Sequence, residues 1–178
     1  MPKNPTIPKP GRPAPALDLH LIIGLQWRLE DQSPDAFTMV NFYRGLHCPI
    51  CGDHLKRLRG LYDDFLAKGV EVINVSMDTE EKAREAHESW GLDPIPMGYG
   101  LTEEAAMEWG LYLSDGRGGK EPDLFSEPGL AWVRPDGTLY LMEVASAPFV
   151  RPDLDLLLGK VDMIREKDYP PRGAHGVA

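Results

Sequence analysis

The chain has 178 residues, which is the size of one domain, and 26% of them are charged. A domain of this length buries about 70% of its unfolded surface, so it needs neither a disulfide framework nor a metal ion to stay folded. The formal net charge of −9 disfavours a nucleic-acid or anionic-membrane partner, because both bind a basic face. No apolar run reaches the roughly 18 residues of a membrane span, and no signal-peptide layout precedes the body, which favours a cytoplasmic location.

The chain begins with a proline-rich segment. Six of the first fifteen residues are proline, so this segment cannot donate enough backbone hydrogen bonds to form a helix or a central strand. We expect an extended surface lead over residues 1–16, with a docking arm for another protein as the alternative. A single domain should follow over residues 17–178.

After residue 16, the hydrophobic pattern alternates between strands and helices. Short apolar or β-branched runs predict strands at residues 17–23, 26–29, 36–43, 69–76, 130–133 and 138–144. Apolar residues at helical spacing predict helices at residues 49–68, 78–90, 102–109 and 153–167. At the start of the second helix, Asp78 and Glu81 have the spacing of a capping box. The order predicts an α/β, thioredoxin-like fold, in which helices flank a central mixed sheet that carries an N-terminal β-hairpin extension.

The two cysteines, Cys48 and Cys51, form a single C-x-x-C motif. A disulfide that closes so short a loop stabilises a chain by only about 2 kcal/mol in the chain-entropy model, so the pair is a poor staple. In a chain without export signals, C-x-x-C near a β-α-β pattern indicates redox or metal chemistry instead.

The position of the motif at a helix start favours redox chemistry. Pro49 suits the first helical position, which makes Cys48 the N-cap residue. The free backbone N–H groups and the helix dipole there stabilise a thiolate, and a protonated His47 would add to this effect. Cys51, one turn further on, belongs to the apolar face of the helix. We therefore expect an exposed nucleophile with a low pKa at Cys48 and a shielded thiol with a high pKa at Cys51.

Two other interpretations of these residues stay open. Both cysteines can be inert core residues, since free cysteine is often buried. Alternatively, His47, Cys48, Cys51 and His54 offer four zinc ligands, although all four lie within one helix start, whereas structural zinc sites usually draw on two segments. We therefore expect neither a bound metal nor a bound cofactor.

The segment NFYRGLHCPICGDHL, residues 41–55, resembles the peroxiredoxin-like branch of the alkyl hydroperoxide reductase/thiol-specific antioxidant (AhpC/TSA) family of the thioredoxin superfamily. Members of this branch place Tyr-Arg-Gly after a strand and Cys-Pro-x-Cys at a helix start. The likeness extends to PGLAWVRPDGTLY at residues 128–140, to APFVRPDLDLLL at residues 147–158 and to DYPPRG at residues 168–173.

The resemblance implies a role for each of five residues. Cys48 matches the nucleophilic cysteine, Cys51 the resolving one, and His47 the aromatic residue or histidine that precedes the Cys-Pro-x-Cys motif. Arg44 matches the family arginine four residues before the nucleophile. Pro128 matches a proline that is cis and packs beside the active cysteines in thioredoxin-like proteins, so we expect a cis bond between residues 127 and 128.

The chain departs from the standard peroxiredoxin pattern Pro-x-x-x-Thr-x-x-Cys. Counting back from Cys48, Gly45 stands at the threonine position and Asn41 at the proline position. The hydroxyl that activates the peroxide is therefore missing, and Arg44 or Arg151 is a candidate to replace it.

These observations predict a thiol-based redox enzyme, a thiol–disulfide oxidoreductase or thiol peroxidase of antioxidant type. The Cys48–Cys51 pair would reduce peroxides or disulfides, and an external thiol reductant of thioredoxin, glutaredoxin or glutathione type would restore it. A homodimer is compatible with the resemblance. The alternative is a non-catalytic thioredoxin-fold binding module, with or without a bound zinc ion.

Overall fold

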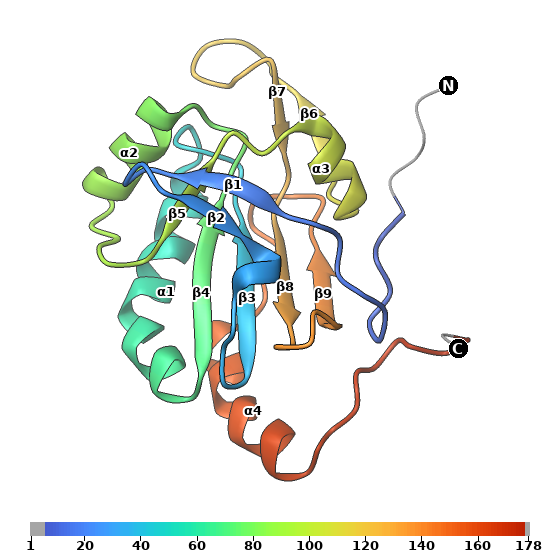
Figure 1. Ribbon diagram of the computed structural model, residues 1–178. Coiled ribbons are helices and arrows are strands. Elements are labelled where there is room, and N and C mark those ends of the chain that lie inside the picture. Colours follow the sequence, from blue (N-terminus) through green and yellow to red (C-terminus); the bar gives the residue numbers. More distant parts are fainter. Residues whose placement is uncertain (1–5, 177–178) are drawn as a thin grey trace.

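The computed structural model describes residues 6–176 (Figure 1). Its strands are β1 (Asp18–Leu21), β2 (Gln26–Arg28), β3 (Phe37–Phe42), β4 (Val70–Val75), β5 (Met97–Tyr99), β6 (Leu113–Asp115), β7 (Leu124–Ser126), β8 (Gly129–Val133) and β9 (Leu139–Val144). Its helices are α1 (Pro49–Ala67), α2 (Glu80–Ser89), α3 (Glu103–Glu108) and α4 (Leu154–Glu166), with a short 3-10 turn at Leu29–Asp31.

Seven of these strands form one mixed sheet in the order β2-β1-β5-β4-β3-β8-β9. The central strands β3, β4 and β5 are parallel, whereas β8, β9, β1 and β2 pair antiparallel to their neighbours. Strands β6 and β7 form a separate antiparallel pair, the β6–β7 hairpin, which lies above the main sheet in Figure 1. The sheet confirms the predicted thioredoxin-like α/β class, and β1–β2 is the predicted N-terminal hairpin, joined to the sheet through β5.

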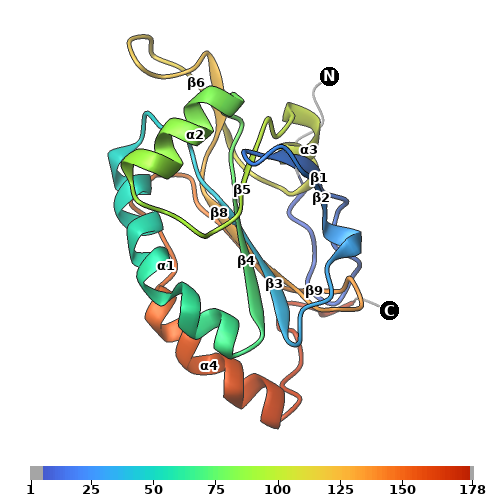
Figure 2. The same ribbon diagram turned by 60° about the vertical axis from the view of Figure 1, so that its left-hand side comes forward.

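Helices cover both faces of the sheet, and Figure 2 shows α1 and α4 side by side on one of them. Alternate residues of a strand point to opposite faces. Met39 and Trp132 therefore pack in the apolar cluster under α1 and α4, whereas Val40 and Ala131 pack toward α3 and the N-terminal segment. Both cores are buried, which fixes α1 against the sheet and holds its first turn at the end of β3.

The strands that the pattern did not predict are β5, β6 and β7, each of three residues. Such short strands carry too little periodicity to stand out, and they form because a neighbouring strand pairs with them. Helix α2 also begins one residue later than the capping-box spacing predicts. Thr79 is its N-cap and accepts from the Lys82 N–H at 3.4 Å, because the Asp78 carboxylate bonds elsewhere.

The main sheet has β2 at one edge and β9 at the other, and the described part of the proline-rich lead pairs with the β9 edge. The Gly11 N–H donates to the Leu139 carbonyl at 2.8 Å, and the Leu139 N–H donates back to the Arg12 carbonyl at 2.8 Å. Pro13 forms an isolated bridge with Thr138. The lead therefore covers the beginning of β9 and the turn before it, while residues 1–5 of the predicted lead lie outside the described residues.

None of the helices within residues 6–176 has both the length and the apolar composition that crossing a membrane requires.

Candidate active site

The first turn of α1 holds Cys48 as its N-cap and Pro49 as its first residue, as the sequence predicts. The Cys48 sulfur accepts a hydrogen bond from the backbone N–H of Cys51 at 3.3 Å. The Cys48 N–H in turn donates to the Gly45 carbonyl at 3.1 Å, which closes a tight turn before the helix. The sulfur is thereby held at the positive end of the helix, where negative charge is stabilised.

This environment lowers the pKa of Cys48 from 9.0 to about 6. The main cause is a hydrogen bond from the Cys51 thiol, which outweighs the opposing effect of burial. The backbone N–H of Cys51 and the Arg44 guanidinium lower the pKa further. Cys48 is therefore mostly a thiolate at neutral pH, in the direction that the sequence predicts.

Cys48 is not the exposed residue that the sequence predicts. Its exposed fraction is 2% and that of Cys51 is 0%. Both sulfurs pack in an apolar cluster with Tyr43, Leu55 and neighbouring residues of α2 and β5. The helix-start pattern places the Cys48 sulfur near free N–H groups but carries no information about this cover, which comes from residues that are distant in sequence.

Cys51 is the deeper thiol of the pair, and its burial raises its pKa well above the usual range. The Arg151 guanidinium donates to the Cys51 sulfur, with Nη2 and Sγ 2.8 Å apart. Both cysteines are free, and no disulfide joins them. The structure therefore represents the reduced form of the pair.

Arg44 lies at the site, and its guanidinium is paired with two carboxylates. Its Nε is 3.2 Å from a carboxylate oxygen of Glu127, and its Nη2 is 3.9 Å from one of Glu121. The guanidinium also lies 4.7 Å from the centre of the Phe125 ring. These three partners all come from the β6–β7 hairpin and the residue that follows it, so this hairpin determines where Arg44 points.

His47 also packs on the hairpin, with its ring centre 4.6 Å from that of Phe125. Burial lowers the pKa of His47, and the Arg44 charge lowers it further. A lowered pKa disfavours the protonated form of His47, the form in which the sequence predicts that it adds to the stabilisation of the Cys48 thiolate.

The predicted cis bond before Pro128 is wrong. The Glu127–Pro128 bond is trans, and a cis bond lies instead at Asp93–Pro94. The backbone on both sides of residue 128 is paired in an extended conformation, since the Glu127 N–H donates to the Tyr112 carbonyl at 2.7 Å and the Pro128 carbonyl accepts from Ala145 at 2.9 Å. Glu127, the residue before Pro128, forms an ion pair with Arg44.

Asp78 is a site residue that the sequence assigned to a helix cap. It is buried, and its carboxylate accepts from the Leu46 N–H at 2.8 Å. Burial raises its pKa. Gly45 has a φ of +136°, and a Cβ there would lie 2.7 Å from the nearer Asp78 oxygen. A side chain at the position where standard peroxiredoxins carry threonine would therefore strain the backbone and displace the Asp78 carboxylate.

A polar cavity of about 490 Å³ opens next to this turn. It is lined by Leu46, His47, Asp78, Lys82, Glu85, Gly119 and Lys120. One oxygen of the buried Asp78 carboxylate has no hydrogen-bond partner within the described chain. The cavity therefore gives small polar molecules a place beside His47, the residue that precedes Cys48.

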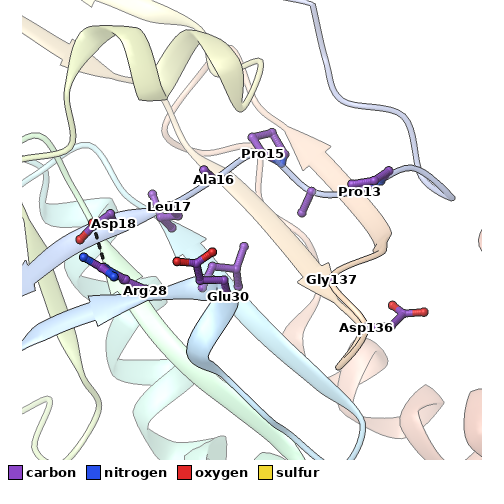
Figure 3. A pocket seen from close by; sticks show the side chains of 11 residues that line it. Pro13, Pro15, Ala16, Leu17, Asp18, Arg28, Glu30, Asp136 and Gly137 are labelled. Atoms are coloured by element: carbon purple, nitrogen blue, oxygen red, sulfur yellow. Dashed lines mark hydrogen bonds and ion pairs between the residues drawn. The ribbon is translucent and has the colours of Figure 1, made fainter.

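A second cavity, of about 590 Å³, lies between the lead, the β1–β2 hairpin and the β8–β9 turn (Figure 3). Pro13, Pro15 and Leu17 form much of its apolar wall, and the Asp18–Arg28 ion pair lies at its rim, with 3.2 Å between the two groups. Its lining includes neither cysteine and none of the predicted site residues.

The zinc alternative finds no support in the arrangement of side chains. Within residues 6–176, no group of three or more His, Cys, Asp and Glu side chains is placed to hold a metal ion. His54 is half-buried, and desolvation of its ring together with the nearby Arg151 charge lowers its pKa to about 4. A guanidinium at this position repels a cation.

Comparison with known proteins identifies the family. A sequence model of the AhpC/TSA family matches residues 10–142. No curated protein gives a significant match. Among solved structures, a peroxiredoxin-like protein from Aquifex aeolicus is 16% identical, with a TM-score of 0.72 and 89% of each chain covered.

Two further solved structures agree with it. Peroxidoxin BcpB from Mycobacterium tuberculosis is 19% identical, with a TM-score of 0.71, and the match covers 88% of this chain and 98% of that one. A thiol peroxidase from Chromobacterium violaceum is 15% identical, with a TM-score of 0.70, and the match covers 92% and 90% of the two chains. The chain therefore belongs to the AhpC/TSA family and is a thioredoxin-fold antioxidant enzyme of the thiol peroxidase class.

Proposed function

We propose that Cys48 is the peroxide-reducing nucleophile of this enzyme and that Cys51 resolves the oxidised form. The observation that carries the proposal is the first turn of α1, where the Cys48 sulfur accepts the Cys51 N–H at 3.3 Å and has a pKa of about 6. A thiolate is the reactive form of cysteine, and a helix N-terminus is a site that stabilises it.

In the first step, the Cys48 thiolate attacks the terminal oxygen of a hydroperoxide, ROOH. The S–O bond forms as the O–O bond breaks, which leaves Cys48 as sulfenic acid and releases RO⁻, which takes up a proton to give ROH. Cys48 is oxidised by two electrons and the peroxide is reduced by two. In the second step, the Cys51 sulfur displaces hydroxide from the sulfenic acid and forms a Cys48–Cys51 disulfide.

The burial of Cys48 favours a small substrate. With only 2% of the residue exposed, a hydrogen peroxide molecule or a small hydroperoxide fits the approach more readily than a folded protein disulfide does. The polar cavity beside His47 supports the same substrate class, since it offers hydrogen-bonding groups next to the reactive turn. The dithiol chemistry needs no bound cofactor, and an external thiol of thioredoxin, glutaredoxin or glutathione type reopens the disulfide.

A single-turnover experiment tests the proposal. Reduced wild type, Cys48→Ser and Cys51→Ser are mixed with one equivalent of hydrogen peroxide and analysed by intact mass, with and without a sulfenic-acid trap. Each variant keeps one of the two cysteines, so each is the matched control for the other.

We expect wild type to lose two hydrogens, Cys51→Ser to accumulate trapped sulfenic acid, and Cys48→Ser to consume no peroxide. Peroxide consumption by Cys48→Ser at the wild-type rate would contradict the assignment. A folded, reduced wild type that reduces neither peroxide nor a small disulfide would favour the binding-module alternative.

A further inference from the structure

Arg151 lies in the segment between β9 and α4, one hundred residues from Cys51 in the sequence. Its Nε donates to the Pro148 carbonyl at 2.9 Å, which fixes the plane of the guanidinium. Its Nη2 donates to the Cys51 sulfur at 2.8 Å. The Arg151 side chain therefore points at the Cys51 sulfur, whereas the thiolate of the reduced pair is on Cys48.

The guanidinium of Arg151 has no carboxylate partner. Among the ion pairs within residues 6–176, none includes Arg151, and its Nη1 is buried without a hydrogen-bond partner. Burial raises the pKa of Glu143, and the nearby Arg151 charge lowers that pKa by less. The neighbouring His54 is neutral and supplies no negative charge.

Arg151 is half-buried, with its Nη1 atom buried, and a cation that loses part of its hydration without gaining a counter-ion is unfavourable. Cys51 is the group in contact with the guanidinium that can become an anion. A cationic donor attracts an anionic acceptor through their opposite charges, in addition to the hydrogen bond that it also makes to a neutral acceptor. Arg151 therefore stabilises the ionised form of Cys51 far more than its neutral form.

We propose that Arg151 is the catalytic residue of the resolving step, in which it stabilises Cys51 as the attacking thiolate after Cys48 has been oxidised. The proposal rests on the proposed function of the two cysteines and assigns Arg151 to the second step rather than to activation of the peroxide.

The order of events follows from the charges around the pair. In the reduced enzyme, the Cys51 S–H donates to the Cys48 thiolate, and that negative charge opposes a second thiolate beside it. Conversion of Cys48 to sulfenic acid removes the charge, while Arg151 stays in place. Cys51 then ionises, its sulfur attacks the Cys48 sulfur, and the S–O bond breaks. The hydroxide that leaves takes up the proton released by Cys51, so one disulfide and one water are formed.

The test compares Arg151→Gln and Arg151→Lys with wild type in single turnover. Arg57→Gln is the matched control, because Arg57 is exposed on α1 and pairs with Asp155, away from the sulfurs. Sulfenic-acid trapping follows the first step and intact mass follows disulfide formation. Circular dichroism and thermal unfolding confirm that each variant is folded.

We expect Arg151→Gln to oxidise Cys48 at nearly the wild-type rate but to form the disulfide about 100-fold more slowly, the loss seen when one charge-stabilising donor is removed from a reacting group. Arg151→Lys should recover part of the rate, and Arg57→Gln should match wild type. Unchanged disulfide formation in Arg151→Gln would overturn the proposal. So would a slower first step with a normal second one, which would assign Arg151 to peroxide activation.

A second measurement does not depend on turnover. In Cys48→Ser, the remaining thiol is Cys51, and its ionisation is followed by thiolate absorbance. We expect Cys51 to ionise at lower pH in Cys48→Ser than in Cys48→Ser/Arg151→Gln. Equal titrations would overturn the proposal for Arg151. Wild-type Cys48 that is inert to peroxide would instead contradict the proposed function and leave this titration result standing.

Discussion

The Cys51 thiol is the largest favourable influence on the Cys48 thiolate, so its removal tests the electrostatics of the site directly. Cys51→Ala deletes the S–H donor, whereas Cys51→Ser keeps a hydroxyl donor at nearly the same position. In both variants Cys48 is the one remaining cysteine, so the ultraviolet absorbance of the thiolate reports on it alone.

A hydrogen bond to a charged group contributes about 1.5–3 kcal/mol, and each 1.36 kcal/mol changes an ionisation equilibrium tenfold. We therefore expect Cys51→Ala to shift Cys48 toward the thiol by about 10- to 100-fold, and Cys51→Ser to shift it much less. The backbone N–H of residue 51 and the Arg44 guanidinium remain in both variants. The pKa of Cys48 should thus stay below its ordinary value of 9.0 even in Cys51→Ala.

Absorbance is recorded against pH for the two variants, with the unfolded chains in denaturant as the reference. If Cys51→Ala and Cys51→Ser titrate together, the side chain of Cys51 is not the source of the low pKa. If both titrate like the unfolded chain, the helix start does not stabilise a thiolate, and the account of the site fails.

Three further predictions concern the turn before α1. Arg44→Met leaves Glu127 buried without its cation, so urea unfolding should show a loss of about 3 kcal/mol; a loss near zero would mean that the ion pair contributes nothing. Gly45→Ala forces a Cβ to within 2.7 Å of Asp78 and should lower both the thermal stability and the reactivity of the site, whereas Gly118→Ala, also at positive φ but in open space, should lower stability less. Hydrogen peroxide turnover should be about 10²–10³-fold slower than in a peroxiredoxin that has the threonine, and an equal rate would show that another donor replaces it.

Local sequence signals predicted the parts of the molecule that depend on neighbours in the chain. Pro49 fixes the first turn of α1, so the N-cap position of Cys48 and the direction of its pKa follow from the local sequence around the motif. The strands β3, β4 and β8 are long enough for their apolar pattern to reveal them, whereas the three-residue β5 depends on its pairing with β4 and β1.

The parts that sequence reasoning missed depend on distant segments. The residues that cover Cys48 include members of α2 and β5, and the Phe125 ring against His47 belongs to the β6–β7 hairpin. The two carboxylates that pair with Arg44 belong to this hairpin and to the residue that follows it. Asp78 looked like a helix cap because its spacing to Glu81 fits one, but its carboxylate is committed to the Leu46 N–H. No local pattern predicts which of the two sulfurs Arg151 contacts, because the position of Arg151 depends on how the segment between β9 and α4 folds back onto α1.

The central claim, that Cys48 is the peroxide-reactive thiolate, is tested most directly by the pH dependence of its oxidation. The rate of hydrogen peroxide consumption in single turnover is measured from acid to alkaline pH for wild type and for Cys48→Ser. Because the thiolate is the reactive form, the account predicts a wild-type rate that rises with pH through a midpoint near the Cys48 pKa of about 6 and is constant above it, and no reaction in Cys48→Ser. A midpoint near the ordinary thiol value of 9.0, or a rate that survives in Cys48→Ser, would contradict it.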